Sequence, residues 1–376
     1  MNVLLVIPTL GQGGAQRVLV NLANSLASFV TGKGSDEQSE RKSFSVSIVT
    51  FTSADMIPHH KPHTQVDVYY TGVISGSRMK ASGLFFNIWK LRGVIAQVKP
   101  DVVVAFQDIA NFPTILACFN LNIPLIVSER QDTRFYSFSF VRRFLRWFLY
   151  RRVDRVVVQT ELVKSQMPLA ILPRTVVIPN PGPDNNVCLS GYDRPLQYCE
   201  IISVGRLEYQ KNFSLLVDAA AIALQRNEKW SLTIYGEGSL RGSLEKQIDD
   251  LGMSSRIRLP GVTSKIFERM FHAQVFVLPS RYEGFPNVLA EASSFGLACV
   301  AYADVSGVPE IIVANENGIL LGREQRNPGD LSKAILELMN DVDLRDSMGR
   351  AGVAMGRRFE PGNLIEIWVQ LILSVR

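Results

Sequence analysis

The stretch VLLVIPTLGQGGAQR, residues 3–17, sets the fold class. A short apolar run ends in a glycine-rich turn, after which Val18, Leu22 and Leu26 recur at helical spacing. A buried strand, a glycine-rich turn and an amphipathic helix in this order are typical of the opening unit of a parallel α/β sheet.

The same alternation of short β-branched runs and helix-length segments recurs along the chain. Further strands are predicted at 46–51, 100–106, 124–129 and 154–160, and a second block at 201–207, 230–238, 256–261, 275–280 and 298–303. Residues 178–195 are crowded with Pro, Gly, Asn and Asp and are interpreted as a linker. We therefore predict two doubly wound α/β domains, 1–180 and 198–376. The last helix, 361–376, is too apolar to be fully exposed and is expected to pack on one domain, its own or the first, or to bridge both.

Ligands of such sheets bind outside the carboxyl ends of the strands, so a cleft between the domains is the expected site.

With 376 residues, 47% of them hydrophobic and 20% charged, the chain is neither disordered nor fibrous. Its four cysteines are widely spaced, which argues against a disulfide framework or a thiolate zinc site and favours a reducing cytoplasm. No metal site is expected from the four histidines either.

The basic residues are concentrated in the first half. Residues 1–197 hold 21 Lys/Arg against 13 Asp/Glu, whereas residues 198–376 hold 19 against 22. Two segments, 78–99 and 141–155, combine five and six basic residues with several aromatics and are predicted to form basic amphipathic helices. No run approaches the ~18 apolar residues of a spanning helix. These helices predict peripheral binding to an anionic membrane surface on its cytoplasmic face; the alternative is that the aromatics face the core. Nucleic acid is disfavoured because no DNA- or RNA-binding motif accompanies the charge.

Three motifs point to chemistry. In the first, residues 11–17, backbone N–H groups at a helix start can hold an anion, but Gln16 occupies the third-glycine position of a dinucleotide fingerprint and no P-loop occurs. A simple tight turn is the alternative.

In the second motif, Arg206 follows a strand and Lys211 lies five residues later. Two cations from one loop suit a diphosphate leaving group, and an ordinary solvated loop is the alternative.

The third motif, SRYEGFPNVLAEA at 280–292, is the most informative. Glu283 follows a strand, Pro286 suits the first turn of a helix, and Glu291 lies more than a turn inside that helix. Carboxylates bind sugar hydroxyls and a helix start binds phosphate, so a nucleotide sugar satisfies both. Two unrelated acids would be the alternative, but the loop, proline and helix context argues against it.

These motifs together resemble a known family. The pattern GRLxxxKN followed about seventy residues later by EGFPNVLAE, with the Gly-Gly turn after the first strand, is similar to the retaining family 4 glycosyltransferases of GT-B fold. The resemblance spans nearly the whole chain and implies an α/β fold of two Rossmann-like domains facing a central cleft. It also implies sugar transfer from a nucleotide donor, usually a UDP-sugar, without an essential metal or other cofactor.

The resemblance assigns roles by position. Gly13 and Gly14 would lie against the donor diphosphate or the acceptor, Arg206 and Lys211 would neutralise the diphosphate, and Glu283 would hold the transferred sugar near its reacting carbon. Glu291 would bind the ribose hydroxyls. The remaining donor-binding assignments are the loop and helix start at Phe285, Pro286, Asn287 and Val288, and the base-contacting strand end at Val262.

One position departs from the family. Many members carry a histidine where this chain has Arg130, and an arginine does not serve as a neutral base. A front-face mechanism in which the leaving diphosphate takes the acceptor proton fits this departure. Asp108, Glu129 and Arg130 are the candidate acceptor contacts. The Ser-Glu-Arg tripeptide at 128–130 resembles enzymes that build bacterial surface polysaccharides and lipid-linked oligosaccharides.

We therefore expect a transferase that moves a hexose or N-acetylhexosamine onto a growing glycan, carried on undecaprenyl diphosphate. Two other functions stay open at this point. One is a GT-B nucleotide-sugar epimerase or hydrolase, which would need no acceptor. The other is a catalytically silent protein that binds a nucleotide sugar or a lipid.

Overall fold

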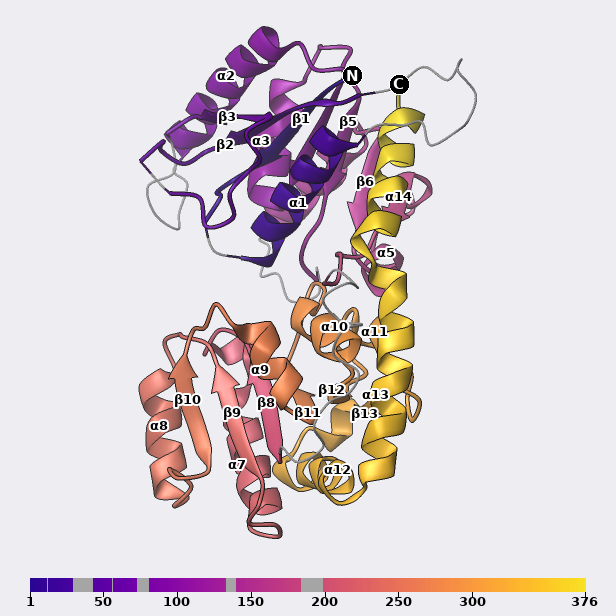
Figure 1. Cartoon of the computed structure of the whole chain (residues 1–376). Helices are drawn as coiled ribbons and strands as arrows, with labels where there is room; N and C mark the ends of the chain where they lie inside the picture. Colours follow the sequence, from indigo (N-terminus) through magenta and orange to yellow (C-terminus); the bar gives the residue numbers. More distant parts are fainter. Residues whose placement is uncertain (12, 30–42, 56, 73–80, 133–139, 184–198) are drawn as a thin grey trace. The chain divides into compact units, whose positions relative to one another are not determined.

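The structure, a computed structural model, describes all residues except 12, 30–42, 56, 73–80, 133–139 and 184–198. The chain divides into two compact units (Figure 1): Met1–Asn180 together with Gly362–Arg376, and Pro181–Pro361. The part of the predicted linker from residue 184 to 195 lies outside the described residues. Each unit is built on its own parallel sheet.

The N-terminal unit contains a seven-stranded sheet in the order β3-β2-β1-β4-β5-β6-β7. Its strands are β1 (Asn2–Ile7), β2 (Ser45–Thr50), β3 (Val66–Tyr70), β4 (Val102–Phe106), β5 (Leu125–Ser128), β6 (Arg155–Val158) and β7 (Thr175–Val177). Every neighbouring pair is parallel. The strand order reverses direction between β1 and β4, which places a topological switch point there.

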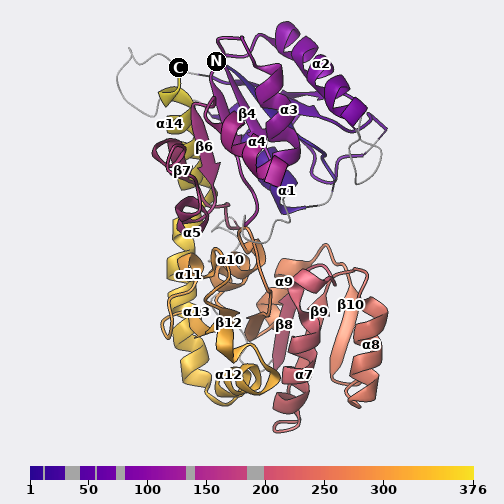
Figure 2. The same ribbon diagram turned by 180° about the vertical axis from the view of Figure 1, so that it is seen from behind.

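Helices cover both faces of this sheet. Side chains of β1 alternate between them, with Val3, Leu5 and Ile7 in one core cluster and Leu4 and Val6 in the other. The first cluster includes α1 (Gly14–Ser28), and the second includes α2 (Ala81–Val98), α3 (Asp108–Ala117) and α4 (Phe140–Tyr150). Figure 2 shows α2, α3 and α4 in front of the sheet. The short helices α5 (Glu161–Ser165) and η1 (Leu172–Arg174) lead to the last strand.

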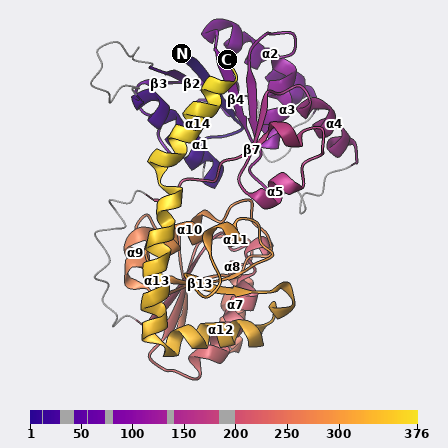
Figure 3. The ribbon, with the colours of Figure 1, turned by 90° about the vertical axis from the view of Figure 1, so that its right-hand side faces the viewer.

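The C-terminal helix α14 (Pro361–Ser374) belongs largely to the N-terminal unit. The predicted second domain ran to 376, and packing of its last helix on the first domain was one of the predicted alternatives. Its Leu364, Trp368 and Ile372 join the core cluster of α1, and Figure 3 shows α14 beside α1. The Trp368 ring stacks on Phe106 with centroids 5.7 Å apart. The apolar density of this segment is therefore explained by burial on the first sheet.

The C-terminal unit contains a six-stranded parallel sheet in the order β10-β9-β8-β11-β12-β13. Its strands are β8 (Glu200–Val204), β9 (Ser231–Tyr235), β10 (Ile257–Gly261), β11 (Val275–Leu278), β12 (Ala298–Tyr302) and β13 (Gly318–Leu321). Its helices are α7 (Phe213–Leu224), α8 (Arg241–Asp250), α9 (Ile266–His272), α10 (Asn287–Ser294), α11 (Val308–Ile311), α12 (Pro328–Asn340) and α13 (Val342–Gly356), with 3-10 turns η3 (Tyr209–Lys211), η4 (Arg323–Gln325) and η5 (Arg357–Phe359). The switch point of this sheet lies between β8 and β11.

Candidate functional site

The predicted catalytic residues lie in the two loops that flank the switch point of the C-terminal sheet. Arg206 and Lys211 follow β8, and Glu283 follows β11, the strand hydrogen-bonded next to β8. The carboxyl ends of both strands lie at one edge of the sheet, where ligands of doubly wound folds bind. The structure therefore brings together residues that are 72 positions apart in sequence.

Lys211 and Glu283 form a close ion pair at this edge. The Lys211 Nζ lies 2.6 Å from the Glu283 Oε1, and the two side chains are only 13% and 9% exposed. Ser280 Oγ donates to the same carboxylate oxygen at 2.7 Å, and Gln210 Nε2 donates to the other at 3.2 Å. These bonds fix the carboxylate in one orientation before any ligand binds.

Arg206 is exposed and less constrained. Its Nη2 lies 3.4 Å from the Gln210 Oε1, a long hydrogen bond. Gln210 also donates to the Tyr282 carbonyl at 2.9 Å. Its amide therefore links Arg206 to Glu283, and Glu283 in turn pairs with Lys211. Sequence analysis missed Gln210 and Ser280 because uncharged polar residues in a loop carry no distinguishing pattern.

Glycines let the loops after β8 and β9 approach each other. A Cβ on Gly236, whose φ is +147°, would lie 1.9 Å from the Gly205 carbonyl oxygen, and one on Gly238 would lie 2.4 Å from the Leu207 carbonyl oxygen. A Cβ on Gly205 would meet the Lys211 side chain at 2.8 Å. Backbone packing therefore sets the course of the Lys211 side chain toward Glu283.

The EGFPN motif forms the approach to α10. Pro286 precedes the helix, Asn287 begins it, and Phe285 is buried with its ring 5.7 Å from that of Phe359. A Cβ on Gly307 would lie 2.6 Å from Pro286, so the loop after β12 packs directly on this turn.

The helix start has no side-chain cap. The Asn287 N–H donates to the Phe285 carbonyl at 3.0 Å and the Leu289 N–H to the Pro286 carbonyl at 2.9 Å, which leaves the Val288 N–H as the group of this turn suited to an anion. Glu291, predicted to bind ribose, is 3% exposed inside α10. Its carboxylate is therefore almost wholly covered in the structure.

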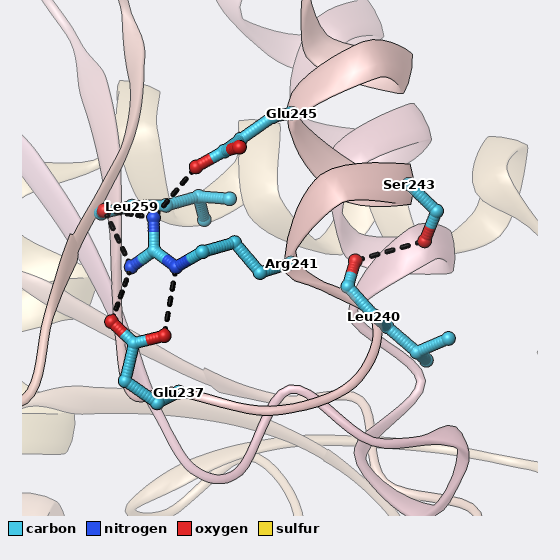
Figure 4. A network of polar contacts seen from close by, with 6 residues as sticks. All are labelled: Glu237, Leu240, Arg241, Ser243, Glu245 and Leu259. Carbon is cyan, nitrogen blue, oxygen red and sulfur yellow. Dashed lines mark hydrogen bonds and ion pairs between the residues drawn. The ribbon is translucent and has the colours of Figure 1, made fainter.

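The predicted base-contacting residue, Val262, is 62% exposed just beyond β10. The neighbouring loop is held by Arg241, which donates through Nε and Nη2 to both Glu237 oxygens at 2.8 and 2.7 Å (Figure 4). Its Nη1 donates to Glu245 at 2.6 Å, and both terminal nitrogens lie 3.1 Å from the Leu259 carbonyl. This network ties the loop after β9 to Leu259 within β10.

The remaining predicted residues lie in the N-terminal unit, on the corresponding edge of its sheet. Gly13 and Gly14 are exposed at the start of α1, and Asp108 is buried at the start of α3. These loops follow β1 and β4 and so flank the switch point of this sheet. Gln107, between β4 and α3, has a positive φ of 74°, which is uncommon for a residue with a side chain.

Glu129 and Arg130 follow β5 and have different environments. The Glu129 carboxylate accepts a hydrogen bond from the Tyr150 hydroxyl and lies 3.4 Å from Arg146 Nε. Burial raises the pKa of the Tyr150 hydroxyl, and the Glu129 charge raises it further. Arg130 instead donates from Nη1 to the Asn180 Oδ1 at 2.6 Å. The Glu129 carboxylate is thus already bonded to Tyr150 and Arg146. Of the two predicted acceptor contacts, Arg130 is therefore the stronger candidate.

In the described part of the chain, no group of three His, Cys, Asp or Glu is arranged to hold a metal ion. Among the same residues, no helix combines the length and apolar character needed to cross a bilayer.

Two family models match the chain, one for each unit. The model described as Glycosyltransferase Family 4 matches residues 12–181, and the model described as Glycosyl transferases group 1 matches residues 192–355. Together they cover most of the sequence. The chain belongs to the family 4 glycosyltransferases of GT-B fold. It is therefore a glycosyltransferase.

Individual relatives of this glycosyltransferase are moderately similar over long stretches. An N-acetylgalactosaminyltransferase of Campylobacter jejuni, named for a PP-undecaprenol-linked saccharide, is 26% identical over 100% of this chain and 99% of its own. The amylovoran biosynthesis glycosyltransferase of Erwinia amylovora is 25% identical over 80% of this chain and 85% of its own. Among solved structures, an Anabaena protein in complex with UDP and glucose superposes with a TM-score of 0.78 at 19% identity, covering 99% of both chains. That likeness establishes the GT-B fold.

Proposed function

We propose that this glycosyltransferase transfers a hexose or N-acetylhexosamine from a UDP-sugar, with retention of configuration, onto a growing glycan carried on undecaprenyl diphosphate. The observation that carries the proposal is the largely buried Lys211–Glu283 pair at the switch point, with Arg206 linked to it through Gln210. A site with two cations and one oriented carboxylate matches a substrate that has a diphosphate on one side and a sugar on the other.

The proposed roles follow from charge and geometry. Arg206, exposed and held by one long hydrogen bond, has donors for the diphosphate, and Lys211 Nζ has two N–H groups beyond the one on Glu283. As the bond between the anomeric carbon and the diphosphate oxygen breaks, negative charge grows on the leaving group and positive charge on the sugar. Arg206 and Lys211 stabilise the negative charge on the leaving diphosphate, and the Glu283 carboxylate stabilises the positive charge on the sugar.

The acceptor oxygen then bonds to the anomeric carbon on the face that the diphosphate leaves, and its proton passes to a leaving phosphate oxygen. This route needs no separate protein base. The route is therefore compatible with an arginine at position 130. Burial lowers the pKa of the Arg130 guanidinium to about 9, so the group is still charged at neutral pH and does not act as a base.

Two relatives support the substrate class. The Campylobacter jejuni enzyme is named for transfer to a PP-undecaprenol-linked saccharide, and the Erwinia amylovora enzyme for amylovoran biosynthesis. The Anabaena protein with the same fold was solved with UDP and glucose. For the present chain we take from these a UDP-sugar donor and a lipid-linked glycan acceptor.

UDP release from a panel of UDP-sugars, with and without lipid-linked glycans extracted from bacterial membranes, tests the proposal. We expect release from one donor that depends on the extract. Release that is equal without the extract would indicate a hydrolase or an epimerase, and no release under either condition would contradict the proposed donor or acceptor.

We also propose that Arg206 and Lys211 take the place of a divalent cation at the diphosphate. Turnover measured in excess EDTA should equal turnover in added Mg²⁺ or Mn²⁺. A loss of activity in EDTA that is restored by one metal would contradict this.

The proposed carrier requires contact with a membrane, and α2 offers a suitable surface. Phe85 and Trp89 are 74% and 70% exposed on this helix, so these aromatics do not face the core. Lys90 lies over the Phe86 ring, with Nζ 4.7 Å from its centroid. Exposed aromatics beside cations are typical of helices that lie in the headgroup region of a bilayer. The predicted basic residues Arg78 and Lys80 lie outside the described residues.

A second exposed aromatic group lies on α4 and after α3. Phe144 and Phe148 are 55% and 45% exposed, with their rings stacked 6.5 Å apart. The Arg152 guanidinium lies 4.7 Å from the Phe119 ring and 5.4 Å from the Phe148 ring. Arg92 of α2 donates to the Phe119 carbonyl at 3.3 Å, so the two groups are linked through Phe119.

Flotation with vesicles tests this part of the proposal. The wild-type chain should float with vesicles containing anionic lipid, and each Arg or Lys near the surface should contribute about 1 kcal/mol. Trp89→Ser with Phe148→Ser should abolish flotation. Ile222→Ser, at an exposed site on α7 in the C-terminal unit, is the control and should float like wild type. Equal flotation with neutral and anionic vesicles would contradict the electrostatic contribution.

A further inference from the structure

Arg130 carries a buried charge whose main hydrogen-bonding edge has no partner. The residue is 7% exposed, and Nη1 donates to Asn180, but Nε and Nη2 are buried with no hydrogen-bond partner. The guanidinium is placed by aromatic contact, 4.2 Å from the centroid of Phe106 and 5.9 Å from that of Trp368. No described carboxylate bonds to it.

Glu129, the neighbouring residue, does not neutralise Arg130 because the two side chains point to opposite faces of the sheet. Glu129 faces the α4 side of the sheet, where Tyr150 and Arg146 engage its carboxylate. Arg130 faces the opposite side, toward Trp368 of α14. Successive residues leaving a strand point to opposite faces, so the two charges are separated by the sheet edge.

The free edge has a specific shape. Nε and Nη2 present two parallel N–H bonds, the fork that binds both oxygens of a phosphate or carboxylate. Burial denies this edge water and lowers the pKa of the guanidinium to about 9. An uncompensated buried charge opposes folding, and an arriving oxyanion would remove that cost.

We propose that Arg130 is an oxyanion-binding residue that takes a phosphate of one of the two substrates through its Nε–Nη2 edge. This inference rests on the proposed function, since that function supplies two phosphate-bearing substrates, the donor diphosphate and the carrier diphosphate. Arg130 lies beyond the carboxyl end of β5, at the edge of the N-terminal sheet that also carries Asp108 and the exposed glycines. Its phosphate site is therefore built from residues of the N-terminal unit, whereas Arg206 and Lys211 belong to the C-terminal unit.

The chain offers a matched control in Arg345. This arginine is 6% exposed, lies 5.0 Å from the Trp230 ring and also has an unpartnered Nε. However, its Nη1 bonds the carbonyls of Leu338, Met339 and Asp341 in the C-terminal unit. Arg345 is thus a buried arginine that satisfies backbone acceptors, which is the structural role that Arg130 would have if the proposal were wrong.

The experiment compares Arg130→Met, Arg130→Lys and Arg345→Met in the full chain. Without ligand, Arg130→Met should unfold at the wild-type temperature or above, whereas Arg345→Met should unfold several degrees lower. In turnover, Arg130→Met should raise KM at least tenfold for one substrate, and Arg130→Lys should restore less than half of that loss because an ammonium lacks the fork. A rise confined to the UDP-sugar assigns the donor phosphate, and a rise confined to the lipid-linked glycan assigns the carrier phosphate.

A readout without turnover keeps this inference separate from the proposed function. Because the free edge is covered, an oxyanion must move neighbouring groups as it binds. Inorganic pyrophosphate should therefore change hydrogen exchange in peptides spanning 125–132 in wild type and in Arg345→Met, but not in Arg130→Met. The proposal would be overturned if Arg130→Met were destabilised as much as Arg345→Met while both KM values and the pyrophosphate-dependent exchange stayed as in wild type. If wild type shows this exchange effect but transfers no sugar, the proposed function fails while the oxyanion site stands.

Discussion

Arg206 and Lys211 share one loop, yet their surroundings predict different consequences of mutation. Lys211 is 13% exposed and pairs with a buried carboxylate, whereas Arg206 is exposed and makes one long hydrogen bond. Lys211→Ala leaves the Glu283 charge buried without its cation and should lower the free energy of unfolding by about 3 kcal/mol. Arg206→Ala should change it by less than about 0.5 kcal/mol.

Both substitutions should nevertheless raise the donor KM and lower kcat, because the diphosphate is present in the ground state and gains charge in the transition state. Denaturant unfolding and initial rates measured on the same preparations separate the two effects. Equal destabilisation by both variants, or an unchanged donor KM in both, would contradict the site as described.

The sequence predicted these residues at strand ends but not their pairing. Lys211 and Glu283 meet because β11 lies beside β8, and that order depends on how the whole sheet assembles. The buried state of Arg130 was equally hidden, since Phe106 and Trp368 come from a distant strand and from the last helix. Tertiary contacts, which a single sequence does not display, decide such environments.

At the scale of elements, the loops after β8 and β9 depend on Gly236. Its φ is +147°, and a Cβ added there would lie 1.9 Å from the Gly205 carbonyl oxygen, which leaves no room for a side chain. Gly236→Ala should separate the two loops, displace Lys211 from Glu283 and reduce kcat/KM at least tenfold.

Gly242→Ala is the matched control, because Gly242 lies in α8 with no atom within 4 Å of the added carbon. It should keep full activity and gain up to about 1 kcal/mol of stability, since alanine is the better helix former. Thermal unfolding and initial rates measure both variants. Wild-type activity in Gly236→Ala would show that the close approach is not needed.

Strand prediction succeeded in the middle of the sheets and failed mainly at their edges. All the central strands were predicted as apolar runs, but β3, β7 and β13 were missed, and each is an edge strand. A central parallel strand is buried on both faces and shows a continuous apolar run, as in β4, whose residues are all buried. The partly exposed VDVYY of β3 and the three residues of β7 carry no such signal.

At the scale of the whole molecule, α14 makes the N-terminal unit depend on the end of the chain. Trp368 is 4% exposed between Phe106 and the α1 core, and Trp368→Ala should cost about 3–5 kcal/mol of stability in this unit. Ile367→Ala on the same helix is the control, because Ile367 is 43% exposed and its truncation should cost less than about 1 kcal/mol.

Hydrogen exchange measured along the chain distinguishes the two units. In Trp368→Ala, protection should fall in β1 and α1 while β8, β11 and α10 keep wild-type protection, since the core of the second unit contains no α14 residue among those described. Equal loss of protection in both units would contradict this division of the core.

The role of Glu283 is the central claim, and single-turnover transfer by Glu283→Gln tests it most directly. The substitution keeps the shape of the side chain in its loop and removes the charge that we propose faces the transferred sugar. With donor and acceptor saturating, we predict a rate at least about 10²-fold below wild type and UDP binding by calorimetry within a fewfold. Glu228→Gln, an exposed site in the same unit, should match wild type. Near-normal transfer by Glu283→Gln would contradict the assignment of the Lys211–Glu283 pair as the catalytic centre.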